Sequence, residues 1–322
     1  MSLPISKLTI ASRRSRLALK QTSIVADLIR RAHPAVEIDV LEVTTTGDRD
    51  ARPFAQIGGK GLFTSEVERA VAEGRADLAV HSAKDLTAAL APGCAIVMVP
   101  ERASVHDVIV GGKGSDGRDR LASLPPGSKI GTSSMRRRSL LAEARPDLDP
   151  VEFRGNLDTR IRKLQDGEVD AAILAAAGLE RLGIGAELSA PLDPTWWIPA
   201  PAQGALAVEA LAERADVADL LGPLDDATAR AEVELERSFA TTMEGGCSIP
   251  LGCLARCTGD GIVATGFLGW PDGSQAFRDR VSGAARDGHA LGAELAEAIL
   301  RGGGDDLIED LKHEDLPVVG EP

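Results

Sequence analysis

Arginine and lysine are concentrated between residues 131 and 163, where eight basic and five acidic residues give a net charge of +3; the whole chain carries −13, so the remainder carries −16. Thr132 and Ser133 stand where an expected strand leads into an expected helix, so hydroxyls and free backbone N–H groups would meet the positive end of the helix dipole. Arg136 and Arg137 in the first turn oppose that dipole unless an anion lies beside them. The pattern favours a cleft for carboxylates or phosphates over the alternative, a solvated helix face with an ordinary serine cap.

A glycine-rich stretch, Gly58–Phe63 (GGKGLF), places Lys60 between glycines. It does not satisfy the phosphate-loop pattern G-x-x-x-x-G-K-[ST], because Phe54 stands at the first position and Gly61 follows the lysine. Two interpretations stay open from spacing alone: a loop that carries Lys60 over a site, and a plain glycine turn before a helix.

The stretch Ala79–Leu86 (AVHSAKDL) ends an expected buried strand in polar residues. Ligands of open α/β sheets bind beyond the carboxyl ends of strands, so Lys84 and Asp85 are candidates for a charge partner and a carboxylate catalyst. A surface ion pair between them is an equal alternative, and His81 is equally well explained as a structural histidine.

One cysteine, Cys247, follows two glycines in MEGGCSIPLGC and lies outside any periodic apolar face. We expect no metal site, because Cys247, Cys253 and Cys257 lack paired C-x-x-C spacing and have no histidine nearby. Two interpretations remain, an inert buried thiol and a nucleophile or point of covalent attachment.

Alternating strand and helix patterns must position these residues. We expect strands at residues 8–10, 36–43, 77–80, 129–131, 170–174 and 262–268, and helices at residues 16–31, 62–74, 134–144, 157–166, 227–242 and 285–300. This βαβ rhythm predicts an α/β protein with parallel-rich sheets covered by helices. The polar tail from Glu309 onward is expected to be loosely held.

Composition limits the classes of function. The chain has 322 residues, enough for two or three domains, with 43% hydrophobic and 26% charged residues, which is ordinary for a globular protein. A net charge of −13, 3% aromatic residues and no tyrosine argue against nucleic-acid binding. The longest apolar run, Ala171–Ala177, is far too short to span a membrane, the N-terminus has no apolar signal region, and four cysteines do not form a disulfide framework. We therefore expect a cytoplasmic protein.

Nine segments, in order from about residue 8 to residue 257, resemble the porphobilinogen deaminase (hydroxymethylbilane synthase) family of tetrapyrrole biosynthesis. Each segment alone is a weak match, but nine in the family's order are specific. They are IASRRSRLALKQT, VTTTGDR, GGKGLFTSEVERA, DLAVHSAKD, GTSSMRRRSLL, RGNLDTRIRKL, AAILAAAGLERLG, PAPAQGALAVE and ERSFATTMEGGCSIPLG.

The resemblance implies three α/β domains, the first two like type II periplasmic binding proteins with a cleft between them and the third smaller. Domain 1 would comprise residues 1–103 and 204–226, with the catalytic aspartate and a lid loop. Domain 2, residues 104–203, would bind substrate and cofactor through arginines, and domain 3, residues 227–322, would carry the cofactor cysteine. It further implies a monomer with porphobilinogen as its small-molecule partner.

The resemblance also implies a dipyrromethane cofactor, joined by a thioether to the cysteine of EGGC, which is Cys247 here. Four porphobilinogen molecules would be deaminated and joined head to tail on this primer, and hydroxymethylbilane would be released by hydrolysis, with ammonia as by-product. Asp85 matches the family's catalytic aspartate, which would stabilise positive charge on a pyrrole nitrogen. Lys60 and Phe63 match the mobile cover of the site. The residues matching the family's carboxylate-binding set are Arg13, Ser15, Lys84, Thr132, Ser133, Arg136, Arg137, Arg154 and Arg160.

Three positions depart from the family pattern. Gln56 stands where a second loop lysine is common, Ala202 replaces a common glycine between domains, and Arg16 stands where proline is frequent. None is an inferred catalytic or cofactor position. A second hypothesis is a non-enzymatic two-domain protein that binds a small anion through the same arginine cleft, but EGGC and HSAKD would have no role in it.

Overall fold

The computed structural model describes residues 5–45, 64–185, 188–243 and 249–313. The chain divides into two compact units. Unit 1 consists of residues 1–103 and 204–230, and unit 2 of residues 104–203 and 231–322. The chain therefore changes unit at positions 103/104, 203/204 and 230/231.

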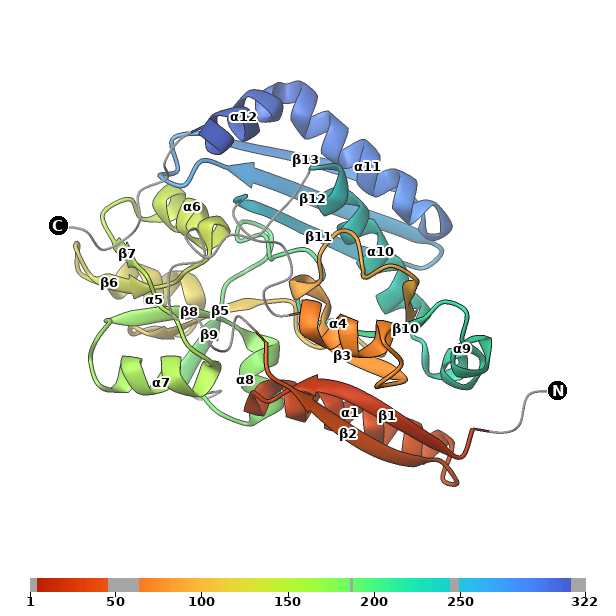
Figure 1. Ribbon diagram of the computed structural model, residues 1–322. Helices are drawn as coiled ribbons and strands as arrows, with labels where there is room; N and C mark the ends of the chain where they lie inside the picture. Colours follow the sequence, from red (N-terminus) through yellow and green to blue (C-terminus); the bar gives the residue numbers. More distant parts are fainter. Residues whose placement is uncertain (1–4, 46–63, 186–187, 244–248, 314–322) are drawn as a thin grey trace. The chain divides into compact units, whose positions relative to one another are not determined.

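Unit 1 contains a mixed five-stranded sheet in the order β2-β1-β3-β10-β4. Its strands are β1 (Lys7–Arg13), β2 (Glu37–Val43), β3 (Leu78–Ser82), β4 (Cys94–Met98) and β10 (Leu206–Leu211). Strands β1, β2 and β3 are parallel, whereas β10 is antiparallel to its neighbours β3 and β4. Apolar residues alternate between the faces, so helices α1 (Arg16–Ala32) and α9 (Ala215–Leu221) cover one face and α4 (Ser65–Ala72) covers the other (Figure 1). The short turns are η1 (Ala83–Asp85) and η3 (Gly222–Leu224).

Unit 2 contains a second mixed five-stranded sheet, in the order β7-β6-β8-β5-β9. Its strands are β5 (Asp107–Gly111), β6 (Lys129–Gly131), β7 (Asp149–Val151), β8 (Ala171–Ala175) and β9 (Ser189–Pro191). Helices α5 (Gly117–Ser123) and α6 (Met135–Ala144) pack on one face, and α7 (Leu157–Gln165) and α8 (Ala176–Leu182) on the other.

The two five-stranded sheets share one topology. Across each sheet, three parallel strands lie side by side, the next strand (β10 or β5) runs antiparallel to them, and the last strand (β4 or β9) forms the edge. The antiparallel strand is in both cases the first strand after a change of unit, at 203/204 or at 103/104. The carboxyl ends of the parallel strands consequently meet at one edge of each sheet, where ligands of α/β proteins bind.

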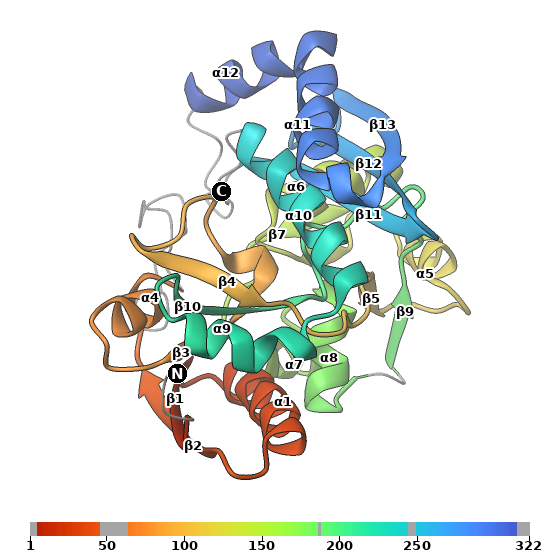
Figure 2. The same ribbon diagram turned by 90° about the vertical axis from the view of Figure 1, so that its right-hand side faces the viewer.

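The C-terminal part of unit 2 is an antiparallel three-stranded sheet, β11-β12-β13, covered by helices. Its elements are β11 (Leu251–Thr258), β12 (Gly261–Gly269), β13 (Ala276–Ala284), α10 (Ala227–Thr242), η4 (Ala285–Asp287), α11 (Gly288–Ile299), η5 (Leu300–Gly304) and α12 (Asp305–His313). Helix α11 lies along the sheet and α10 lies beside α11 (Figure 2). The helices approach so closely at Gly292 that a Cβ there would lie 2.2 Å from the carbonyl oxygen of Leu235.

The outer edge of β11 is closed by hydrogen bonds from outside the sheet. Alternate backbone N–H groups of this edge strand donate to Pro199 O (from Cys253, 3.0 Å), to Glu236 Oε1 (from Ala255, 2.8 Å) and to Glu232 Oε1 (from Cys257, 3.1 Å). Both glutamates lie on α10, one helical turn apart. Since unpaired strand edges invite pairing with other chains, these acceptors satisfy the edge internally.

The expected α/β class and parallel-rich sheets are confirmed, as are the helices at α1, α6, α7 and α10. Patterning did not reveal β4, β5, β7, β9, β10, β11 or β13, which are short or lack a clear period. The expectation of a loose tail from Glu309 is wrong as far as residue 313, because α12 buries Leu307, Ile308 and Leu311. Residues 314–322 lie outside the described residues.

Candidate functional site

In unit 1 the predicted site residues follow two neighbouring parallel strands. Arg13 ends β1, and Lys84 and Asp85 form the turn η1 directly after β3. Because β1 and β3 are paired in parallel, these residues lie at the same edge of the sheet. The Asp85 side chain is exposed, and its carboxylate has no hydrogen-bond or ion-pair partner among the described residues. A carboxylate in this position is available to a ligand.

The start of α1 is joined to the same edge. Ser15 is the N-cap of α1, and its Oγ accepts a hydrogen bond from the backbone N–H of Ala18 at 3.2 Å. From the second turn of the helix, Gln21 Nε2 donates to Ser82 Oγ at 2.8 Å. Strand β1, helix α1 and the end of β3 are therefore held together just before Asp85.

A buried charged cluster lies on the α4 side of this sheet. His81 Nε2 lies 2.9 Å from Glu209 Oε2, with the two side chains 3% and 0% exposed, which supports the structural interpretation of His81. Glu68 on α4 is also buried, and burial followed by the charge of Glu209 raises its pKa above the usual glutamate value. One carboxylate oxygen of each glutamate lacks a hydrogen-bond partner within the described structure. Burial, helped by Glu209, likewise raises the pKa of the Cys94 thiol to about 12, so this thiol is a poor nucleophile.

In unit 2 the hydroxyls predicted to bind an anion stand between β6 and α6. Thr132 Oγ1 accepts from the Ser134 N–H (3.2 Å), and Ser133 Oγ accepts from the Phe153 N–H (3.1 Å). The Ser134 side chain caps α6 by accepting from the Arg137 N–H. Accepting a backbone N–H leaves each hydroxyl its own O–H to donate, so the group retains donors for an anion.

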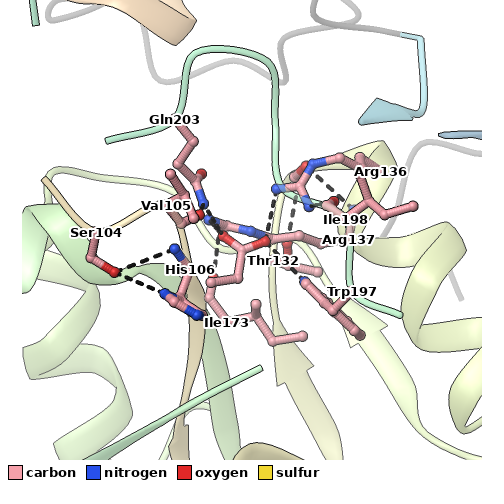
Figure 3. A network of polar contacts seen from close by, with 12 residues as sticks. Ser104, Val105, His106, Thr132, Arg136, Arg137, Ile173, Trp197, Ile198 and Gln203 are labelled. Atoms are coloured by element: carbon pink, nitrogen blue, oxygen red, sulfur yellow. Dashed lines mark hydrogen bonds and ion pairs between the residues drawn. The ribbon is translucent and has the colours of Figure 1, made fainter. Parts of the chain in front are cut away.

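Arg136 and Arg137 meet an anion that belongs to the chain itself. Asp107, fully buried at the start of β5, accepts from Arg136 Nη2 at 2.8 Å and from Arg137 Nη2 at 2.7 Å. Trp197 Nε1 (2.9 Å) and Gln203 Nε2 (3.0 Å) donate to the same carboxylate, and Figure 3 shows these four side chains converging. The negative charge expected beside Arg136 and Arg137 in the first turn of α6 is thus supplied by Asp107, a residue of unit 2 itself.

Sequence patterning missed Asp107. Its only signal is an acid at the head of the apolar run Val108-Ile109-Val110. In a strand, the period of two places Asp107 on the same face as Ile109, which is the buried α6 face. An acid at such a position requires internal donors, but the sequence does not say which ones.

The remaining arginines of the predicted set stand at the start of α7. Arg154 follows β7 and its Nε lies 3.4 Å from Glu152 Oε1. Arg160 Nε donates to the Gly155 carbonyl oxygen at 2.9 Å. Both side chains are half-buried, and their strand end lies at the same edge of the sheet as Thr132, because β6 and β7 are parallel.

Three predicted positions, Lys60, Phe63 and Cys247, lie outside the described residues, as does Gln56.

Ala202 is the position near the 203/204 change of unit that departs from the family pattern. Its φ is +59°, and in the described ranges it is the only residue other than glycine with a positive φ. Its N–H donates to Glu236 Oε2 at 2.5 Å, and this buried acceptor holds the left-handed backbone.

The described residues hold neither a membrane-spanning helix nor a cluster of metal ligands. None of the described helices combines the length and apolarity that crossing a membrane requires. No group of three or more histidine, cysteine or acidic side chains in these ranges is arranged to hold a metal ion.

Comparison with known proteins gives matches along most of the chain. The family model "Porphobilinogen deaminase, dipyromethane cofactor binding domain" matches residues 8–219, and "Porphobilinogen deaminase, C-terminal domain" matches residues 230–301. The porphobilinogen deaminase of Roseiflexus castenholzii is 46% identical over 304 residues, covering 94% of this chain and 99% of that protein. That of Methylobacillus flagellatus is 44% identical over 308 residues, covering 95% and 98%.

Solved structures give more distant likenesses. The Bordetella pertussis BvgS periplasmic VFT2 domain is 14% identical, with a TM-score of 0.39 over 68% of this chain and 85% of that one. The periplasmic aliphatic sulphonate binding protein SsuA from Escherichia coli is 16% identical, with a TM-score of 0.38 over 74% and 71%.

Proposed function

The chain belongs to the porphobilinogen deaminase family and has hydroxymethylbilane synthase activity, and from this premise we propose that Asp85 is its catalytic carboxylate and Cys247 its point of cofactor attachment. The observation that carries the first assignment is the carboxylate of Asp85 at the carboxyl edge of the unit 1 sheet, which is exposed and has no partner among the described residues. Family membership sets aside the alternative of a non-enzymatic anion-binding protein.

Asp85 is suited to the deamination step by its charge. Loss of ammonia from the aminomethyl group of porphobilinogen builds positive charge on the pyrrole nitrogen, and an adjacent carboxylate oxygen stabilises that charge and can hold the N–H proton. The carboxylate needs no internal rearrangement to face a ligand, since no described group competes for it. Gln21 donates a hydrogen bond to Ser82 and so fixes the end of β3, which directly precedes the turn that carries Asp85.

The proposed binding set recognises carboxylates. Each pyrrole ring of the substrate carries an acetate and a propionate, which guanidinium groups and hydroxyl donors bind well. We assign this role to Arg13, Ser15 and Lys84 in unit 1 and to Thr132, Ser133, Arg136, Arg137, Arg154 and Arg160 in unit 2. Support comes from their placement at the carboxyl edges of the two sheets, and from the O–H donors that Thr132 and Ser133 retain.

The residues present fit the dipyrromethane cofactor of the family. In the described part of unit 2, two buried guanidinium groups share one carboxylate, and the buried Nε of Arg137 has no acceptor there, so this N–H remains able to donate to a bound anion. When bound, dipyrromethane supplies the pyrrole carbon to which the chain of rings is joined. Of the described cysteines, Cys253 is fully buried in β11 and burial raises the pKa of the Cys94 thiol to about 12, which argues against attachment at these two; Cys257 is only partly buried, and a Cys257→Ser variant tests it.

We further propose the three-domain division into residues 1–103 with 204–226, residues 104–203 and residues 227–322, and a cytoplasmic monomer with porphobilinogen as its small-molecule partner. Lys60 and Phe63 are proposed to cover the site. The net charge of −13 supports the absence of nucleic-acid partners.

Asp85→Asn tests the catalytic assignment. The amide keeps the shape but cannot stabilise a cation or take a proton, so we expect retained cofactor, shown by intact mass, and turnover reduced at least about 100-fold. Asp27→Asn, which alters an exposed aspartate on α1, is the matched control and should turn over normally. Near-normal turnover in Asp85→Asn would reject the assignment.

Cys247→Ser tests the attachment site. Denatured wild-type protein from cells that make porphobilinogen should carry a covalent adduct and give a colour with Ehrlich's reagent, whereas Cys247→Ser should have the unmodified mass. Cys257→Ser, a change in β11, should keep the adduct. A thioether adduct that persists in Cys247→Ser would place the attachment elsewhere.

A further inference from the structure

The arginine pair of α6 is fixed in orientation by one carboxylate and two carbonyl groups. Arg136 uses Nη2 on Asp107 and Nη1 on the Ile198 carbonyl, both at 2.8 Å. Arg137 uses Nη2 on Asp107 at 2.7 Å and Nη1 on the Ile173 carbonyl at 2.8 Å. With both terminal nitrogens of each guanidinium group bonded, neither group can rotate without breaking a buried hydrogen bond.

Asp107 in turn is held by residues that flank the changes of unit. Trp197 and Gln203 belong to the segment that ends at position 203, and Gln203 Nε2 also donates to the Val105 carbonyl at 2.8 Å, next to the change at 103/104. Figure 3 shows these side chains around the arginine pair. The position of the pair is therefore tied to the segment that ends at position 203 through Asp107 and, for Arg136, also directly through the Ile198 carbonyl.

The charges in this cluster do not balance. Among the described residues, two guanidinium groups with side chains 4% and 8% exposed form ion pairs with one carboxylate, 0% exposed, which leaves these three groups a net charge of +1 in a buried setting. Without Asp107 the charge would be +2, which is costly to bury, and with a second acid the pair would have no residual attraction for an anion. The net charge of +1 on Arg136, Arg137 and Asp107 would therefore be neutralised by one additional carboxylate.

We propose that Asp107 is the positioning residue of the Arg136–Arg137 pair, and that its single negative charge sets the pair to accept one ligand carboxylate. The inference rests on the proposed binding role of the two arginines. Asp107 itself does not touch the ligand: it fixes the direction of the guanidinium groups and removes half of their charge. Its loss should therefore impair recognition of the carboxylated substrate more than the chemical step.

Asp107→Ala with formate as a probe tests the proposal. The substitution removes one carboxylate group, and formate supplies a carboxylate of the same size. We expect a lowered thermal midpoint, restored by at least about 2 °C in formate relative to chloride at equal ionic strength, with saturation. For protein that carries cofactor, KM for porphobilinogen should rise at least about tenfold while kcat per folded molecule changes less than about threefold, and formate should lower KM again.

Asp147→Ala is the matched control, because Asp147 pairs with Arg145 through two hydrogen bonds of 2.7 Å at the opposite end of α6. It should show neither a formate-specific shift nor a change in KM. If Asp107→Ala does not fold, Gln203→Met removes one donor to Asp107 while keeping side-chain length, and should raise KM in the same direction by about two- to fivefold.

Two outcomes separate this inference from the proposed function. An unchanged KM in Arg137→Gln would overturn the binding role of the arginines. A raised KM in Arg137→Gln together with an unchanged KM in Asp107→Ala, or formate acting no differently from chloride on the Asp107→Ala midpoint, would overturn the positioning role of Asp107.

Discussion

Replacing Glu236 by glutamine is expected to destabilise unit 2 by about 2–4 kcal/mol. The carboxylate is fully buried and accepts two backbone N–H groups, from Ala202 at 2.5 Å and from Ala255 at 2.8 Å. A glutamine of the same shape offers one carbonyl oxygen, and its NH2 group faces the second N–H. Leaving that N–H unsatisfied costs about 1–3 kcal/mol, and loss of charge on the remaining bond costs about 1 kcal/mol more.

The assay can observe unit 2 alone. All three tryptophans of the chain, Trp196, Trp197 and Trp270, belong to unit 2, and the chain has no tyrosine. Denaturant unfolding followed by tryptophan fluorescence therefore reports the free energy of unfolding of this unit, while circular dichroism reports both units.

Two glutamates on the same helix serve as graded controls. Glu232 is buried but shares its carboxylate between the Cys257 N–H and the partly exposed Arg256, so Glu232→Gln should cost about 1–2 kcal/mol. Glu234 is exposed, and Glu234→Gln should stay within about 0.5 kcal/mol of the wild type. If Glu236→Gln is no more destabilising than Glu234→Gln, the interpretation of Glu236 as the cap of the β11 edge is refuted.

Two further predictions concern strain and pH. Ala202→Gly should stabilise unit 2 by about 0.5–1 kcal/mol, because relief of the left-handed alanine, about 1–2 kcal/mol, exceeds the entropy that glycine adds to the unfolded chain; a destabilised variant in the same fluorescence assay would contradict this. Glu68→Gln should gain stability relative to the wild type as the pH rises above about 4.5. The sign follows because burial and Glu209 raise the pKa of folded Glu68, so the unfolded chain ionises first and the wild type loses stability with rising pH. Glu73→Gln, an exposed change beside α4, is the control, and a stability difference between Glu68→Gln and wild type that is the same at pH 5 and pH 8 would contradict the prediction.

Much of the candidate site was predictable because its signals are local. Helix α10 was expected at residues 227–242 and is observed with those bounds, since helical periodicity depends on neighbouring residues only. The placement of Asp85 directly after a buried strand, and of Thr132 between strand and helix, follows from the same local patterns. Nine motifs in order also identified the family, which the matches over residues 8–219 and 230–301 confirm.

The partners of the charged groups were decided by the tertiary structure. The excess of arginine near residue 136 indicated an anion, but the anion found there is Asp107, which lies 29 residues away from Arg136 and 30 from Arg137. Likewise Glu209 bonds to His81, 128 residues away, only because the chain returns to unit 1 after residue 203 and forms β10, which pairs with β3. A residue's periodicity tells which face it occupies, whereas the residue opposite depends on strand order and register, which no local pattern encodes.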